Sequence, residues 1–207
     1  MTRTENTEQY EAWNGDSGRR WAADADRRDR ILAPVADALL AAADPRPGER
    51  VLDLGCGCGV TSLAAAQAVG PGGTVTGIDL SAPMLELARD RRNTTALTHI
   101  DVVEGDAQSH DLGGPFDLAI GRFGTMFFAD PTAAFTNLAA AMRPGGRLCL
   151  ATWQPLVANE WLLVPGAALL QYGTIPRGLR PTPALACSPS PSLTRSRACS
   201  LRPGSPR

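Results

Sequence analysis

The sequence predicts an α/β fold with a doubly wound, mostly parallel sheet and helices on both of its faces. Short runs rich in β-branched and apolar residues alternate with Ala- and Leu-rich runs, and Gly, Pro or Asp separates them. Such alternation is typical of parallel strands joined by right-handed helical crossovers. The composition, 43% hydrophobic and 20% charged, is that of a globular chain. The 207 residues are enough for one such domain and a terminal extension.

The elements follow one another in a regular order. The polar residues 1–30 predict an N-terminal helical cap outside the sheet. Apolar residues at helical spacing then predict a helix over 31–43, and the prolines and glycine of residues 45–48 end it. Five strands are predicted at residues 50–54, 74–80, 99–103, 116–120 and 147–152. The intervening helices are expected at residues 61–69, 83–91 and 131–142. The main domain is therefore expected to span residues 31–172.

Residues 173–207 differ in composition from the rest of the chain. They contain seven of the 17 prolines, six arginines and no acidic residue. Such a segment cannot bury a core, which predicts a disordered tail. A sheet of this type ordinarily continues with a further strand pair, so the abrupt change predicts a domain that is incomplete at its C-terminal end, through truncation or a shifted reading frame.

Charge and hydropathy bear on partners and location. The basic tail has no aromatic residue and no apolar helical face, so nucleic acid is not expected as a partner. The chain has neither an N-terminal apolar signal nor a run of about 18 apolar residues, which predicts a cytoplasmic protein without a membrane partner.

The segment Asp53-Leu54-Gly55-Cys56-Gly57-Cys58-Gly59 links the first predicted strand to the helix behind it. Glycines tolerate positive φ, so a ligand can lie against the main chain. The spacing D-x-G-x-G-x-G departs from the dinucleotide fingerprint G-x-G-x-x-G, because Val60 and Ser62 occupy the sixth positions. The chain has no lysine, which excludes a phosphate loop ending in G-K-[ST]. A carboxylate at Asp53 favours a ligand with a cationic amino-acid group.

Acidic residues also follow the next two predicted strands. Asp79 lies about twenty residues after the glycine loop, where an acid can accept hydrogen bonds from both hydroxyls of a ribose. Asp106 follows the third strand within Gly105-Asp106-Ala107. Cys56 and Cys58 are interpreted as small turn residues, because no second Cys or His pair stands at zinc spacing. We therefore expect no metal site.

With these segments in this order, the sequence resembles the class I S-adenosylmethionine-dependent methyltransferases over roughly residues 8–161. The resemblance implies a Rossmann-like fold, S-adenosylmethionine as cofactor, and methyl transfer to a small-molecule acceptor by in-line displacement. It implies that the glycine turn packs on the amino-acid moiety and ribose, that Met84 lies beside the adenine, and that Asp106 contacts the adenine amino group. The segment that contains Arg122 would border cofactor and acceptor. The implied cofactor contacts are Asp53, Gly55, Cys56, Gly57, Gly59, Asp79, Leu80, Met84, Gly105, Asp106, Ala107 and Arg122.

Two alternatives stay open. One is an NAD-dependent oxidoreductase or epimerase on a similar sheet, which the missing sixth-position glycine and Asp53 disfavour. The other is a truncated relative that binds the cofactor without turnover. No catalytic residue is predicted, since His99 and His110 are both expected to be solvated or structural. Trp13 and Trp21 either pack the cap or stack over the cofactor or acceptor.

Overall fold

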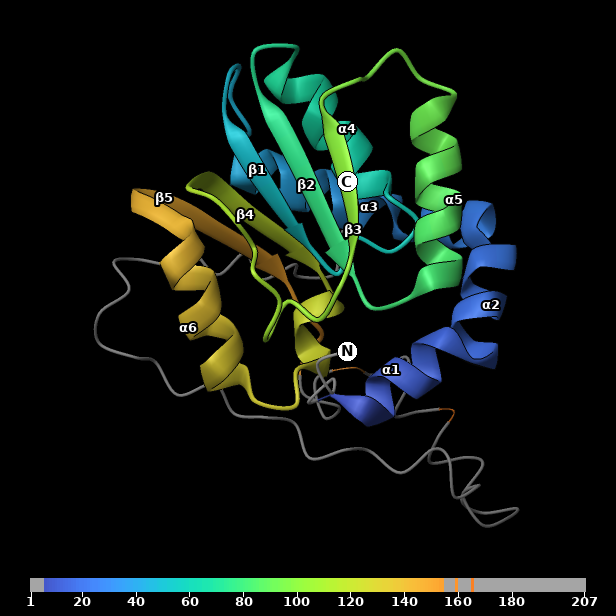
Figure 1. The fold of residues 1–207 in the computed structure, drawn as a ribbon. Coiled ribbons are helices and arrows are strands. Elements are labelled where there is room, and N and C mark those ends of the chain that lie inside the picture. Colours follow the sequence, from blue (N-terminus) through green and yellow to red (C-terminus); the bar gives the residue numbers. More distant parts are fainter. Residues whose placement is uncertain (1–5, 155–158, 160–164, 166–207) are drawn as a thin grey trace. The chain divides into compact units, whose positions relative to one another are not determined.

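The computed structural model describes residues 6–154, 159 and 165 (Figure 1). Two compact units are distinguished, and all elements given below belong to the first, which includes the chain up to Ala151. The tail predicted at residues 173–207 lies outside the described residues, as does most of the predicted main domain after Gln154.

Five parallel strands form one sheet in the order β3-β2-β1-β4-β5 (Figure 1). Their bounds are β1 Arg50–Leu54, β2 Thr74–Asp79, β3 Ile100–Glu104, β4 Phe116–Arg122 and β5 Met142–Ala151. The order reverses between β1 and β4, and in doubly wound folds ligands bind at the carboxyl ends of the strands at this point. The predicted fold class and all five predicted strands are confirmed.

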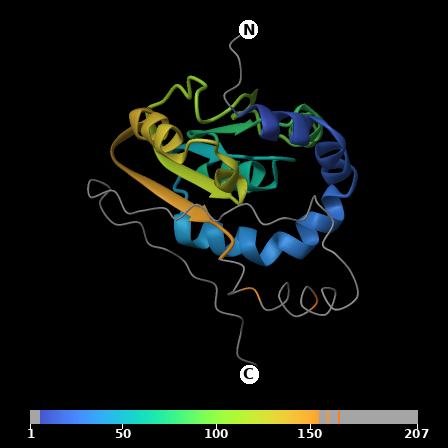
Figure 2. The same ribbon diagram turned by 90° about the horizontal axis from the view of Figure 1, so that it is seen from below.

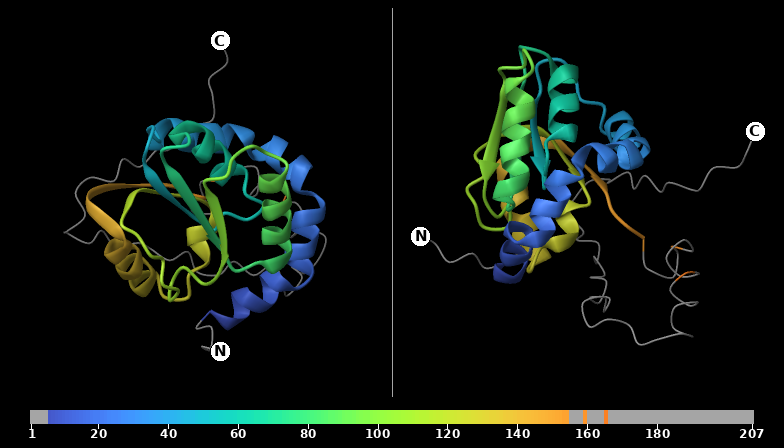
Figure 3. Two further views of the ribbon diagram at one scale, coloured as in Figure 1. Left: turned by 45° about the horizontal axis from the view of Figure 1, so that its top comes forward. Right: turned by 90° about the vertical axis from the view of Figure 1, so that its right-hand side faces the viewer.

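Helices cover both faces of the sheet (Figure 3). On one face α3 and α4 pack against β1, with Leu39, Val51 and Val69 in a common core. On the other face α6 and the loop between β3 and β4 pack around Leu52 and Phe116. Strands covered on both faces are almost continuously apolar, which is why the local pattern predicts them well. The helices have the bounds α3 Ala25–Ala43, α4 Val60–Val69, α5 Ala82–Asn93 and α6 Pro131–Ala141.

The chain before the sheet is helical for most of its length. We call α1 (Thr7–Asn14) and α2 (Asp16–Ala23) the cap, and α3 follows directly. Figure 2 shows the three helices following one another around the edge of the sheet. The helix predicted from Ile31 begins at Ala25 instead. Its first turns are rich in charged residues that obscure the apolar period, although Ala25 itself is buried.

The fifth strand, predicted from residue 147, starts five residues earlier in β5. This strand begins at Met142, opposite Phe116, and its register shifts between there and Leu118. Gly145 adopts φ +76 within the irregular part. The glycines therefore bend the strand instead of preceding it.

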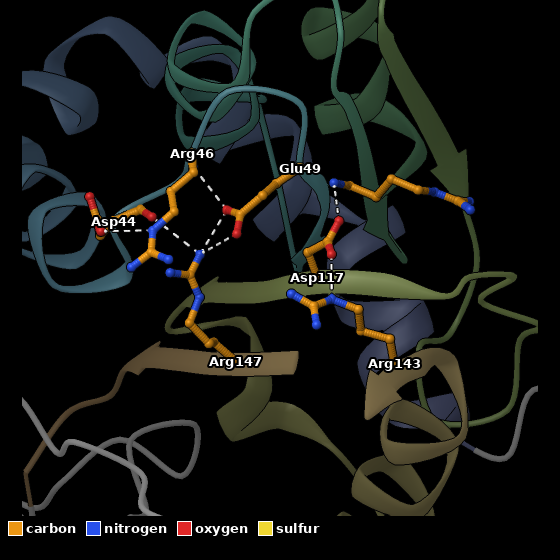
Figure 4. Close-up of polar contacts among 7 residues, drawn as sticks. Asp44, Arg46, Glu49, Asp117, Arg143 and Arg147 are labelled. Atoms are coloured by element: carbon orange, nitrogen blue, oxygen red, sulfur yellow. Dashed lines mark hydrogen bonds and ion pairs between the residues drawn. The ribbon is translucent and has the colours of Figure 1, made fainter. Parts of the chain in front are cut away.

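Ion pairs fasten β5 at the amino edge of the sheet (Figure 4). Arg147 binds both carboxylate oxygens of Glu49, at 2.9 and 2.7 Å. Arg143 binds Asp117, which also accepts the backbone N–H of Arg50 at 2.7 Å. These contacts join the strand to the ends of β1 and β4, far from the edge at which ligands are expected. Within the described ranges, no helix is both long and apolar enough to cross a membrane.

Candidate cofactor site at the carboxyl edge

The glycine loop joins β1 to α4 through three residues with positive φ. These are Gly55 at +67, Gly57 at +54 and Gly59 at +82. A Cβ on Gly55 would lie 2.6 Å from the Cα of Gly124, in the segment after β4, and one on Gly57 would lie 2.7 Å from the Cε of Met84. Both the left-handed backbone and the close packing require glycine here. The loop is thus packed closely between Met84 and the segment after β4.

Asp53 lies in β1 immediately before the loop and is fully buried. Its Oδ2 accepts hydrogen bonds from the hydroxyls of Thr61 and Ser62, both at 2.7 Å, which joins the strand to the first turn of α4. Its Oδ1 has no partner among the residues that the structure describes. Burial raises the pKa of this carboxyl, and the two hydroxyls oppose the increase. A buried polar atom without a partner is uncommon, and beside a ligand-binding edge it indicates a ligand group.

Asp79 ends β2 and connects two loops. Its Oδ2 accepts the backbone N–H of Gly57 at 2.8 Å, and its Oδ1 accepts that of Ser81 at 2.9 Å. Burial raises the pKa of Asp79, while these two N–H groups lower it. An ionised carboxylate offers about four lone-pair positions, so both oxygens keep acceptor capacity for the hydroxyls of a ligand.

Asp106 follows β3 and organises its own loop. Its Oδ1 accepts the backbone N–H of Gln108 at 3.0 Å, and the side chain is largely buried. The preceding Gly105 donates its N–H to the carbonyl of Asp79 at 2.9 Å, and a Cβ on it would lie 2.6 Å from the Nδ1 of His110. The imidazole of His110 therefore packs on a glycine, while Ala107 joins the core.

The cap is bound to the loop after β2. The amide of Asn14 donates to the carbonyl of Leu80 at 2.9 Å and accepts the N–H of Ala82 at 2.9 Å. The hydroxyl of Ser81 donates to the carbonyl of Trp13 at 2.7 Å. Leu80, expected at the cofactor, is thus held beside Asp79 through its main chain.

A second set of contacts binds the cap to the segment after β4. That segment forms a short 3-10 helix, η1 (Gly124–Phe127), which the sequence did not predict. The ring of Trp13 meets the edges of Phe127 and Trp21 at 5.4 and 5.8 Å between centroids. Asn6, directly before α1, donates to the carbonyl of Phe127 at 2.8 Å. Since the cap contacts both sides of the switch point, it lies across the carboxyl edge, with η1 close by in Figure 1.

Met84 lies between the glycine loop and the cap. It is buried in a small cluster with Cys58 and Ala25, against which Trp13 and Trp21 pack. Both indole rings therefore have packing roles. Burial raises the pKa of Cys58 to about 11 and that of Cys56 well above its usual value.

Comparison with known proteins agrees with this geometry. Residues 51–146 match the family model described as a methyltransferase domain. The chain is 32% identical over 158 residues to aklanonic acid methyltransferase DauC of Streptomyces sp. (strain C5), a match that covers 73% of this chain and 71% of that protein. The chain belongs to the class I S-adenosylmethionine-dependent methyltransferase family.

Other methyltransferases are similar over different shares of their length. Nocamycin O-methyltransferase of Saccharothrix syringae is 35% identical over 161 residues, which cover 77% of this chain and 56% of that protein. The chain thus spans little more than half the length of this relative. A S-adenosylmethionine-dependent methyltransferase structure from Aquifex aeolicus has a TM-score of 0.54 at 22% identity, covers 67% of this chain and 78% of its own, and supports the fold alone.

The geometry fits the methyl donor of this methyltransferase family. The unpartnered oxygen of Asp53 suits a cationic ammonium group, and the carboxylate of Asp79 suits two ribose hydroxyls. A side chain at Gly57 would displace Met84, the residue expected beside the adenine. No group of three or more His, Cys, Asp or Glu side chains within the described ranges could hold a metal ion.

Arg122 ends β4, and its surroundings in this methyltransferase could not be read from the sequence. Its guanidinium is largely buried, and the Nη2 lies 3.8 Å from the Oδ1 of Asp29 in α3. The Oδ2 of Asp29 binds the Nη1 of Arg91 at 2.8 Å, and that nitrogen donates to the carbonyl of Cys58 at 3.1 Å. Asp29 and Arg91 come from different helices, so only the tertiary fold brings them together. The same is true of Asn14, which no local pattern distinguishes.

Proposed function

We propose that the protein is a S-adenosylmethionine-dependent methyltransferase that transfers the methyl group to a small-molecule acceptor by in-line displacement. The observation that carries this proposal is the arrangement of Asp79, whose two oxygens accept backbone N–H groups from the glycine loop and from the loop after β2. Membership of the methyltransferase family supports the same donor.

Each group of the donor has a matching group at the carboxyl edge. Asp79 would accept hydrogen bonds from both ribose hydroxyls, and the glycine loop would pack on the amino-acid moiety and ribose. Asp53 would face the ammonium group with its unpartnered oxygen. Met84 would lie beside the adenine, and Asp106 would contact its amino group. The spacing of these residues along three strand ends supports the assignment.

When bound, S-adenosylmethionine supplies an electrophilic methyl group on a sulfonium with a good leaving group. The residues of this chain then have two tasks, which are to orient the reactants and to exclude water. The cap serves both, because Trp13 and Phe127 form an apolar contact over the edge while Asn14 fixes the loop next to Asp79. No covalent intermediate with the protein is required.

Apolar side chains near the edge suit a small organic acceptor. Met126 and Phe127 of η1 and Tyr10 of α1 are each about 40% exposed, which is high for such large apolar groups. Two of the relatives are named for methylation of nocamycin and of aklanonic acid, which supports the same class of acceptor.

The test is titration calorimetry of the full chain with S-adenosylhomocysteine and, separately, with NAD. We expect micromolar binding of the former and none of the latter. A radiolabelled methyl donor then reports transfer in a screen of phenolic and carboxylic acceptors. A folded sample that binds NAD alone would revive the oxidoreductase alternative. Binding of S-adenosylhomocysteine without transfer to any acceptor would favour a relative without turnover.

A further inference from the structure

Arg122 carries a buried donor that the fold leaves without a partner. The side chain is only 12% exposed, and its Nη1 has no hydrogen-bond partner among the described residues. A guanidinium has five N–H donors, and a buried donor that loses water without gaining another acceptor is unfavourable. An acceptor is therefore missing at this position.

The nearby carboxylate of Asp29 does not meet this need. It binds the Nη1 of Arg91 at 2.8 Å, whereas the Nη2 of Arg122 lies 3.8 Å away, beyond hydrogen-bonding distance. Arg91 has a further partner in Asp26, at 2.9 Å. The guanidinium groups of Arg91 and Arg122 thus share the largely buried carboxylate of Asp29. The charge of Arg122 is the less well neutralised of the two.

The position of Arg122 relates it to Asp53. In the sheet register Asp53 lies opposite Ile120, and side chains two residues apart on a strand share a face. Asp53 and Arg122 therefore project from the same face of neighbouring strands, next to the glycine loop. One has an unpartnered buried oxygen and the other an unpartnered buried nitrogen, of opposite charge. Such a pair is complementary to a zwitterion.

We infer that Arg122 binds the α-carboxylate of the methionine moiety of the donor, while Asp53 faces its α-ammonium. The inference rests on the proposed function and goes further, since it names the group on the donor that Arg122 recognises. The contact would be a charge-assisted hydrogen bond from Nη1, the stronger kind of hydrogen bond in proteins. Discrimination between adenosyl compounds that carry this α-carboxylate and those that lack it then depends on Arg122.

The wild-type chain provides the first test. Calorimetry compares S-adenosylhomocysteine with its descarboxy analogue, the adenosyl thioether of 3-aminopropanethiol, which keeps the adenosine, sulfur and amine. We expect the analogue to bind about 10- to 100-fold more weakly, the range for loss of a hydrogen bond between charged groups. Equal affinities would overturn the inference and leave the proposed function intact. If a folded sample binds neither compound, the inference and the proposed function are both contradicted.

Variants then locate the effect. Arg122→Gln should lower the affinity for S-adenosylhomocysteine to near that of the analogue, with little change in binding of the analogue itself. Arg122→Lys should keep part of the difference, because the charge is retained. Arg92→Gln is the matched control, since Arg92 lies on α5 and contacts Asn93 and the carbonyl of Ile100. If folded Arg122→Gln still binds S-adenosylhomocysteine more tightly than the analogue by the wild-type factor, the inference is overturned. If this variant does not fold, the comparison of the two compounds on the wild type tests the inference.

Discussion

Gly55 and Gly124 meet main chain to main chain at the carboxyl edge, where a Cβ on the first would lie 2.6 Å from the Cα of the second. Neither segment has room for a side chain at this crossing. The glycine loop and the start of η1 therefore depend on each other for their positions. This contact joins the segments that follow β1 and β4 at the proposed cofactor site.

Gly55→Ala should consequently lower the free energy of unfolding by about 2 to 4 kcal/mol, because positive φ strain and a backbone clash act together. Gly48→Ala is the control, since Gly48 also has positive φ (+85) but no atom within 4 Å of the added Cβ. Urea denaturation of both variants measures the difference. Equal losses would mean that the close approach to Gly124 contributes nothing.

Asp79→Asn should weaken S-adenosylhomocysteine binding about 10- to 100-fold, the range for hydrogen bonds to a charged acceptor. The amide would also set an N–H₂ group against the N–H of Gly57 or Ser81. Calorimetry measures the affinity, and Asp101→Asn on the exposed face of β3 serves as control. An unchanged dissociation constant would remove Asp79 from the ribose site.

Asn14→Ala should cost about 1 to 2 kcal/mol of stability, since it removes one hydrogen bond to Leu80 and one from Ala82. Hydrogen exchange should accelerate at the N–H of Ala82 in particular. The matched change is Asn93→Ala, at the exposed end of α5. Exchange at Ala82 that stays as slow as in the wild type would contradict the attachment of the cap through Asn14.

The pH dependence of stability should reveal Asp117. The N–H of Arg50 and the guanidinium of Arg143 hold the pKa of Asp117 below its usual value. A lowered folded-state pKa stabilises the protein above the unfolded pKa, about 3.9, and this stabilisation is lost as pH falls through the folded value. The free energy of unfolding of the wild type should therefore exceed that of Asp117→Asn by on the order of 1 kcal/mol near neutral pH. This difference should narrow below about pH 4. Urea denaturation across this pH range measures the difference. A difference that widens on acidification would mean that folding raises the pKa of Asp117 and would contradict the prediction.

Thiol reactivity should report burial at the glycine loop. Burial raises the pKa of Cys58 to about 11, so almost none of it is thiolate near neutral pH. In a chain with Cys149→Ala, Cys187→Ser and Cys199→Ser, which keeps only Cys56 and Cys58, Ellman's reagent should label the native protein slowly and the denatured protein fully. Fast labelling of the native form would show that the loop opens readily.

Local patterns predicted the parts of the molecule whose contacts are local. β1 was predicted at its observed bounds, since a strand buried on both faces shows a continuous apolar run. The start of α3 at Ala25 was missed because Asp26 and Asp29 disturb the apolar period, although both pair with Arg91 in α5. A pairing across more than sixty residues leaves no trace in a window of one helix.

The candidate site divides in the same way. Asp53 and Asp79 stand at strand ends, where topology alone places them at one edge. Asn14 and the unpartnered nitrogen of Arg122 acquire meaning only when distant segments meet, so the sequence indicated a border position for Arg122 and nothing of its environment. The irregular backbone at Gly145 likewise depends on the register shift in the pairing of β5 with β4, between Phe116 and Leu118.

The hydrogen bonds that join Asn14 to Leu80 and Ala82 are made with their main-chain atoms. Either residue can therefore be exchanged for another that leaves the carbonyl or N–H in place, and attachment of the cap survives. The attachment of the cap is therefore independent of the side chains that stand next to Asp79. The surface next to Asp79 can be changed to suit a different ligand, while the cap stays attached through Asn14 and the main chain of Leu80 and Ala82.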